Sequence, residues 1–239
     1  MQRNSRAEQT ADNLRPTQPE PPADTAGGFS SRSRRAFLGG GALATAGAIV
    51  GLTGGEAQAD GGDHHISTAT QFRAIQQHEN DHVKFVVNAL GDSARPKPTF
   101  QNLQARNRAA FFAQSQAFEN TGVGAYLGAA PVLFSRANLA AAGSIAAIEA
   151  RHSGYLNNLL GALTTRNVFG QNQTFERALT ISEVTRLARP FIADLNGGPP
   201  LTFSPTPSAE NDIAILNFAL ALEYLEAEFY NINVPRFFD

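Results

Sequence analysis

The sequence contains no cysteine, which excludes disulfide bonds, thiolate metal sites and a lipid-anchored cysteine from this chain. Any metal must therefore be held by histidine or carboxylate side chains, a ligand set that favours iron, manganese or carboxylate-rich zinc. An excess of positive charge is also lacking, because 19 Lys and Arg stand against 21 Asp and Glu, for a net charge of −2. We therefore expect no nucleic-acid partner and no affinity for an anionic membrane surface.

The alternation of apolar and polar residues that predicts β-strands is also missing, and a helical period dominates instead. It predicts four main helices, at about residues 67–90, from somewhere after residue 99 to about 130, at 138–163 and at 210–230. The last of these is apolar nearly all round, so we expect it to lie centrally in a bundle. The predicted fold class is all-α, with residues 60–239 forming one four-helix-bundle domain.

Residues 164–209 are predicted to be a long loop with one short helix, "ISEVTRLARPFIADL". A loop of this length is unusual in a compact domain. We expect it either to cover one end of the bundle or to be functional in part.

Residues 1–59 are predicted to be a targeting segment that precedes the domain. Residues 1–32 are rich in Pro, Ser and Gln without an apolar period, which predicts disorder. Arg34 and Arg35 then open "SRRAFLGGGALATAGAIVGLTGGEAQAD", which closely resembles a twin-arginine (Tat) export signal with an A-x-A cleavage site at residues 57–59. A transmembrane anchor is the alternative, but the stretch is weakly apolar and interrupted by glycine. We expect the Tat machinery to export the folded chain to the periplasm, the cell envelope or the exterior.

Two Glu-x-x-His pairs stand on two of the predicted helices. Glu79 and His82 lie in "QHENDHV", and Glu149 and His152 repeat the spacing in "IEARH". The i, i+3 spacing places both side chains of a pair on one helix face. A carboxylate on an inward face is costly unless it is paired or bound to a metal. Each pair is therefore a candidate for metal binding.

The other two predicted helices each supply a glutamate with a tyrosine seven residues later. Tyr126 follows Glu119, and Tyr230 follows Glu223. Seven residues are two helical turns, so each tyrosine should lie over the same stripe as its glutamate. One Glu from each of two helices and a Glu-x-x-His from each of two others is the ligand set of di-metal carboxylate bundles. The sequence thus contains the same combination twice: one helix with a glutamate and a tyrosine, and one helix with a Glu-x-x-His pair.

Several readings of neighbouring residues stay open. Glu226 is one turn from Glu223 and could be the ligand in its place, although the match to the Glu119 helix favours Glu223. We expect Glu226, Tyr126 and Tyr230 to contact the ligands rather than a metal. His78 is expected to be a surface residue. The glutamates and histidines could also form a buried polar network without a metal.

Three segments carry a resemblance to a known family. "ILNFALALEYLEAEFY", "ENTGVGAYLGAA" and "IAAIEARH" resemble the ferritin-like proteins grouped with plant desiccation-related proteins and related exported bacterial proteins. The resemblance covers most of residues 65–165 and 210–239 and implies a ferritin-like four-helix bundle. In many relatives the "LEYLEAEFY" helix comes first, whereas here it is last, which predicts a circularly permuted bundle. With this order, the last helix could complete either its own bundle or that of a neighbouring copy, and the second case would make the protein a homo-oligomer.

The resemblance also implies two iron or manganese ions about 3.5–4 Å apart. Glu79 and Glu149 would bridge them, and His82 and His152 would each bind one. Glu119 and Glu223 would complete the set.

Such a centre implies an oxidoreductase-type protein that handles iron, or oxygen or peroxide as a small-molecule oxidant. The alternative is a non-enzymatic stress or desiccation protein of the envelope, with a structural metal or none. A storage cage fits less well with export and with the permuted order. The sequence does not decide whether the chain is an enzyme.

The ligand assignment predicts which substitutions remove the metals. Glu79→Ala or Glu149→Ala should abolish the binding of two metals per chain, because each would remove a carboxylate shared by both ions, whereas His78→Ala should not. Metal content of the three variants, measured by mass spectrometry, checks this expectation. Full metal content in both glutamate variants would show that the assignment is wrong.

Overall fold

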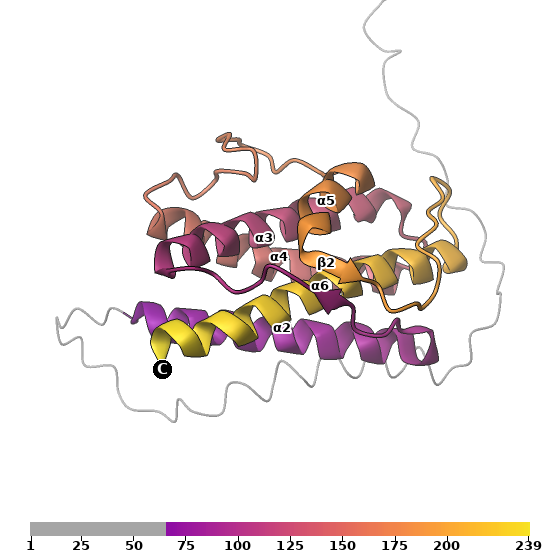
Figure 1. The fold of residues 1–239 in the computed structure, drawn as a ribbon. Helices are drawn as coiled ribbons and strands as arrows, with labels where there is room; N and C mark the ends of the chain where they lie inside the picture. The colour runs from indigo at the N-terminus through magenta and orange to yellow at the C-terminus, as the bar shows by residue number, and fades with distance from the viewer. Residues whose placement is uncertain (1–65) are drawn as a thin grey trace, which may run out of the picture.

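The computed structural model describes residues 66–239, so the predicted disordered region and Tat-type signal lie outside the described residues. Four long helices form the bundle, as Figure 1 shows: α2 (Thr68–Leu90), α3 (Arg108–Ala129), α4 (Arg136–Leu159) and α6 (Ala209–Phe238). Helix α2 packs along α6, and α3 packs along α4. The all-α fold class is therefore confirmed. Among residues 66–239, no helix is long and apolar enough to cross a bilayer.

Each long helix begins at a side chain that accepts a hydrogen bond from its first turn. The acceptor belongs to Ser67 for α2, Asn107 for α3, Ser135 for α4 and Ser208 for α6. A cap of this kind stabilises a helix by about 1 kcal/mol. The cap at Asn107 determines that α3 begins at Arg108, a start that the sequence left open after residue 99.

Helix α6 continues to Phe238, well beyond the predicted end at residue 230, even though it contains Pro235. Tertiary contacts hold this extension. Arg73 in α2 donates to the carbonyl oxygen of Phe238 at 2.6 Å and pairs with the Asp239 carboxylate at 2.8 Å. The C-terminus therefore lies beside the start of α2, as Figure 1 shows. Adjacent chain ends are what a circular permutation requires, and the permuted order itself stays a prediction.

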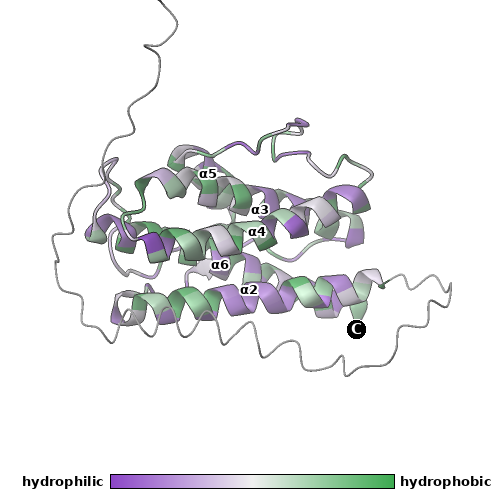
Figure 2. Cartoon of the chain, turned by 180° about the vertical axis from the view of Figure 1, so that it is seen from behind, coloured by the Kyte–Doolittle hydropathy of each residue, from purple (hydrophilic) through white to green (hydrophobic). Residues whose placement is uncertain are grey.

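Two apolar clusters fill the bundle, one toward each end. The first gathers around Phe72, Phe111 and Phe229, and the second around Val86, Ile145 and Leu220. On α2, Ile75 belongs to the first cluster and Val86 to the second, and Glu79 and His82 lie between them. Figure 2 shows a largely hydrophilic stretch near the middle of α2. The bundle thus holds a polar layer between two apolar ones.

The middle of residues 164–209 lies along the outer side of α3, whereas residues 196–204 lie at the end of the bundle where α6 begins (Figure 1). They contain α5 (Ile181–Ala188) and β2 (Ile192–Asp194), which pairs antiparallel with β1 (Thr99–Phe100). Three short 3-10 turns complete the described elements, at Gly91–Ser93, Ala130–Val132 and Arg189–Phe191. The two short strands were not indicated by the sequence pattern. The long segment is therefore mostly a cover for α3.

Glycines in α3 allow this cover to approach closely. The Leu179 N–H donates to the carbonyl oxygen of Gly124 at 2.8 Å. A Cβ atom at Gly124 would overlap the Leu179 side chain, and one at Gly128 would overlap the Leu179 carbonyl oxygen. The absence of side chains at these two positions makes the groove that Leu179 occupies.

This packing predicts opposite effects for two Gly→Ala substitutions. Gly128→Ala should lower the free energy of unfolding by about 1–3 kcal/mol, because the new Cβ forces the backbone of residue 179 away. Gly143→Ala is the matched control, since Gly143 is exposed in α4 with open space around it. It should raise the free energy by about 0.5–1 kcal/mol. Urea unfolding measures both, and a Gly128→Ala variant as stable as the parent would contradict the packing.

Candidate metal centre

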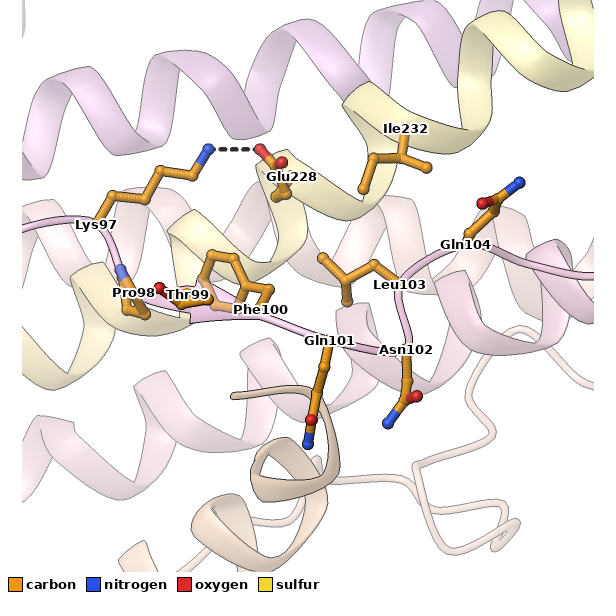
Figure 3. Close-up of a pocket in the computed structure, with 10 residues that line it drawn as sticks. All are labelled: Lys97, Pro98, Thr99, Phe100, Gln101, Asn102, Leu103, Gln104, Glu228 and Ile232. Atoms are coloured by element: carbon orange, nitrogen blue, oxygen red, sulfur yellow. Dashed lines mark hydrogen bonds and ion pairs between the residues drawn. The ribbon is translucent and has the colours of Figure 1, made fainter. Parts of the chain in front are cut away.

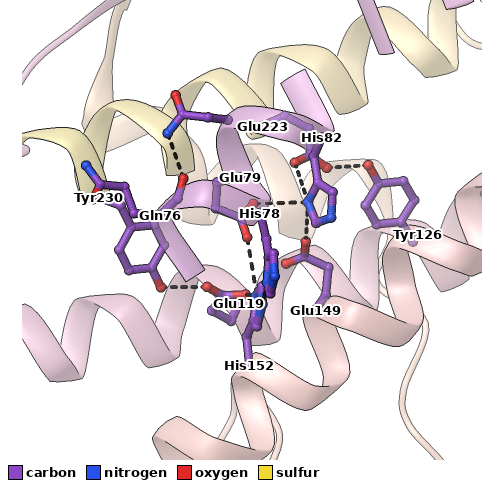
Figure 4. A network of polar contacts seen from close by, with 11 residues as sticks. Gln76, His78, Glu79, His82, Glu119, Tyr126, Glu149, His152, Glu223 and Tyr230 are labelled. Atoms are coloured by element: carbon purple, nitrogen blue, oxygen red, sulfur yellow. Dashed lines mark hydrogen bonds and ion pairs between the residues drawn. The ribbon is translucent and has the colours of Figure 1, made fainter. Parts of the chain in front are cut away.

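The structure brings together all six side chains that the sequence pattern selected (Figure 4). They converge in the polar layer from four helices: Glu79 and His82 from α2, Glu119 from α3, Glu149 and His152 from α4, and Glu223 from α6. They form two groups, in each of which one ligand atom per residue lies within 4.8 Å of the others. One group contains Glu119 and His152, and the other contains His82 and Glu223. Glu79 and Glu149 belong to both, which is the position expected of bridging carboxylates.

The two imidazoles face more carboxylate oxygens than they can serve by hydrogen bonding. The Nδ1 atom of His82 lies 3.1 Å from Glu149 and 3.3 Å from both Glu79 and Glu223. The Nδ1 atom of His152 lies 3.0 Å from Glu119 and 3.2 Å from Glu79. One ring nitrogen carries at most one hydrogen. The arrangement is that of donor atoms directed at a common point.

Several buried carboxylate oxygens in this layer have no hydrogen-bond partner. They are Oε1 of Glu79, both oxygens of Glu149, and Oε2 of Glu223 and of Glu226. Three of these oxygens, Oε1 of Glu79, Oε1 of Glu149 and Oε2 of Glu223, lie within 3.3 Å of a histidine nitrogen, whereas Oε2 of Glu149 and Oε2 of Glu226 have no such contact. Burying the last two unpaired is strongly unfavourable. A pair of metal ions would give them partners, and oxygen with imidazole nitrogen is a donor set that iron and manganese accept. The residues present therefore fit a di-metal centre.

The charges in the layer are strongly coupled. Burial raises the pKa of Glu149, and the charges of Glu79 and Glu119 raise it further. Burial would also raise the pKa of Glu79, but hydrogen bonds from His152 and His82 outweigh it and lower that pKa to about 2. For His152, the effect of burial is outweighed by Glu119 and Glu79, which raise its pKa to about 11. Without a metal, protons on the histidines offset part of the carboxylate charge, so protons and metal ions compete for one set of atoms.

The two tyrosines brace the glutamates across the bundle. Tyr126 in α3 donates its hydroxyl hydrogen to Oε1 of Glu223 in α6. Tyr230 in α6 donates to Oε1 of Glu119 in α3 at 2.5 Å. Each tyrosine thus serves the glutamate of the other helix, not the one on its own helix as the spacing suggested. The second oxygen of each glutamate stays directed at a histidine.

His78 is exposed, as the sequence suggested, yet it contacts the centre. Its Nδ1 lies 2.9 Å from Nε2 of His152, and the two rings stack with centroids 5.2 Å apart. One of these two nitrogens donates to the other, according to the tautomers of the rings. Such outer contacts fix the ring orientation of a ligating histidine. Sequence spacing gave no sign of this contact, because it joins α2 to α4.

Glu226 is buried beside the centre but belongs to neither group of ligand atoms, so the structure places Glu223 there instead. Gly122, which has no side chain, leaves room for the carboxylates of Glu149 and Glu226. A Cβ atom at Gly122 would lie 3.0 Å from Oε2 of Glu149 and 3.4 Å from Oε1 of Glu226. Gly122 is therefore a site residue that the sequence reading missed, within the segment "ENTGVGAYLGAA".

A separate groove of about 480 Å³ lies on the outside of the bundle, where residues 97–104 cross α6 (Figure 3). Its one ion pair joins Lys97 to Glu228. None of the six converging side chains lines it. Despite its size, the groove has no link to the centre, and Glu228 is paired near the surface, away from the metal-ligating atoms.

The bracing by tyrosine predicts a loss of metal affinity without a loss of ligands. Tyr126→Phe or Tyr230→Phe should weaken metal binding about 10–100-fold, because the glutamate that loses its donor is no longer held in place. Tyr224→Phe, in the same helix as Tyr230 but outside the network, should have no effect. Competition with a chelator measures the affinities. Unchanged affinity in both variants would show that the hydroxyl groups do not position the glutamates.

Comparison with protein families gives a match to the ferritin-like domain over residues 44–162 and 211–237. Comparisons with curated proteins and with solved structures gave no match. The matched segments contain all six converging side chains, both tyrosines, Gly122 and Glu226. The residues between them, 163–210, are largely the segment that covers α3. The chain belongs to the ferritin-like domain family.

Proposed function

We propose that this chain is an exported protein that binds two iron or manganese ions and performs oxidoreductase-type chemistry with oxygen or peroxide. The observation that carries the proposal is the convergence of four carboxylates on two imidazole nitrogens that cannot satisfy them by hydrogen bonding. Two adjacent ions that each change by one electron supply two-electron redox chemistry. Export rests on the Tat-type signal in the sequence.

The side chains of the chain would divide the work of holding the ions. Glu79 and Glu149 would bridge them, since both belong to the two groups of ligand atoms. His82 with Glu223 would complete one site, and His152 with Glu119 the other. Tyr126, Tyr230 and His78 would fix the orientation of these outer ligands. The apolar clusters on either side would shield the layer from water along the bundle axis.

A second candidate is a non-enzymatic stress protein of the envelope, with desiccation as the condition that the resemblance suggests. The observation that favours it is that each histidine lies within ion-pair distance of carboxylates. In that protein the polar layer would serve as a buried network of ion pairs.

Metal content and reactivity separate the two candidates. Protein purified from an exporting host should contain about two irons or manganeses per chain. After reduction it should be reoxidised by dioxygen or hydrogen peroxide, followed by stopped-flow absorbance. Glu149→Gln, which keeps the shape but loses the charge, should reduce metal content, whereas Glu228→Gln should not, since Glu228 is outside the layer. A protein that contains no metal and refuses added iron and manganese would contradict the proposal and favour the stress protein.

A further inference from the structure

A narrow cavity of about 40 Å³ lies beside the centre, mainly between α3 and α6. Its walls are predominantly apolar and include small residues of both helices, among them Gly122, Ala125, Ala129 and Ala219. Two carboxylates line it, those of Glu223 and Glu226, and none of its lining residues is cationic. Since Glu223 is one of the converging side chains, the cavity reaches the centre itself.

The cavity runs from the surface inward. Its inner lining residues Gly122, Glu223 and Glu226 are buried, whereas Ala125 and Ala219 in its outer part are partly exposed. Tyr126, which also lines it, stands with Glu223 on one side of the network in Figure 4. The cavity at the seam between α3 and α6 therefore extends from partly exposed residues to buried residues beside one edge of the centre.

The inner end of the cavity holds an unpaired polar group. Glu226 is only 6% exposed, and its Oε2 atom has no hydrogen-bond partner. Across the position of Gly122, its other oxygen faces the carboxylate of Glu149. The carboxyl group of Glu226 is thus positioned to hydrogen-bond to a small molecule that reaches the inner end of the cavity.

Size and lining restrict what this molecule is. A space of about 40 Å³ accepts a molecule of a few heavy atoms and excludes an organic substrate. Apolar walls do not replace the water around a hydrated metal ion, so the cavity does not suit a cation. The polar side of the centre lies toward α2 and α4, where the His82 side chain is 12% exposed and His78 reaches the surface.

We propose that the cavity between α3 and α6 admits a small neutral oxidant with an O–O bond, dioxygen or hydrogen peroxide. At the inner end Glu226 accepts a hydrogen bond from hydrogen peroxide or, as the carboxylic acid, donates one to dioxygen. The inference rests on the proposed function, because an oxidant is useful there only if the centre holds metal.

Xenon tests the cavity independently of metal, because apolar cavities of this size bind it. Crystals of the full chain under xenon pressure should show xenon between α3 and α6. Ala125→Leu should abolish this site, whereas Ala113→Leu, which changes an exposed residue of the same helix, should retain it. A cavity filled by ordered water alone, or one without xenon, overturns the inference. Xenon in a protein that takes up no metal overturns the proposed function and the inference with it.

The reaction of the metal-loaded, reduced protein distinguishes the two oxidants. Dioxygen and hydrogen peroxide are mixed with it separately. Oxidation by the oxidant that uses the cavity should slow about tenfold in Ala125→Leu, equivalent to ~1.4 kcal/mol. Metal content should stay equal to that of the Ala113→Leu control. If neither oxidant reacts more slowly in Ala125→Leu than in this control, the inference is overturned.

Discussion

The burial of carboxylate charge in the middle of an apolar bundle is the constraint on which the rest of this structure depends. Five glutamates lie buried in one layer of the described chain: Glu79, Glu119, Glu149, Glu223 and Glu226. Two imidazoles cannot neutralise them, because each ring carries at most one positive charge. Several of their oxygens are left without a hydrogen-bond partner. Such a layer persists in a stable protein only if protons or metal cations neutralise part of its charge.

The surrounding fold keeps this layer in register. Apolar clusters on either side tie the four helices together, and helix caps determine where each helix begins. The exchange of hydrogen bonds between α3 and α6, from Tyr126 to Glu223 and from Tyr230 to Glu119, fixes the relative height of these two helices. Gly122 lets two carboxylates approach the same point on α3. Stability and the geometry of the centre therefore depend on the same contacts.

The sequence predicts the parts of this arrangement that depend on spacing within one helix. Glu79 with His82, and Glu149 with His152, could be selected because three residues make nearly one turn. The pairing of Tyr230 with Glu119 could not, because it depends on how two helices are aligned. The same holds for the contact of His78 with His152 and for Leu179 in the groove of α3. The ferritin-like family is shown, whereas the permuted helix order and export stay predictions.

The central claim is that this layer is a di-metal centre, and anomalous diffraction tests it most directly. Crystals of protein purified from an exporting host would be measured at the iron and manganese absorption edges. The account predicts two anomalous peaks about 3.5–4 Å apart, one beside Nδ1 of His82 and one beside Nδ1 of His152, at one of the two edges. A structure at high resolution with no anomalous peak in the layer, and with the carboxylates hydrogen-bonded to protonated histidines and water, would contradict it.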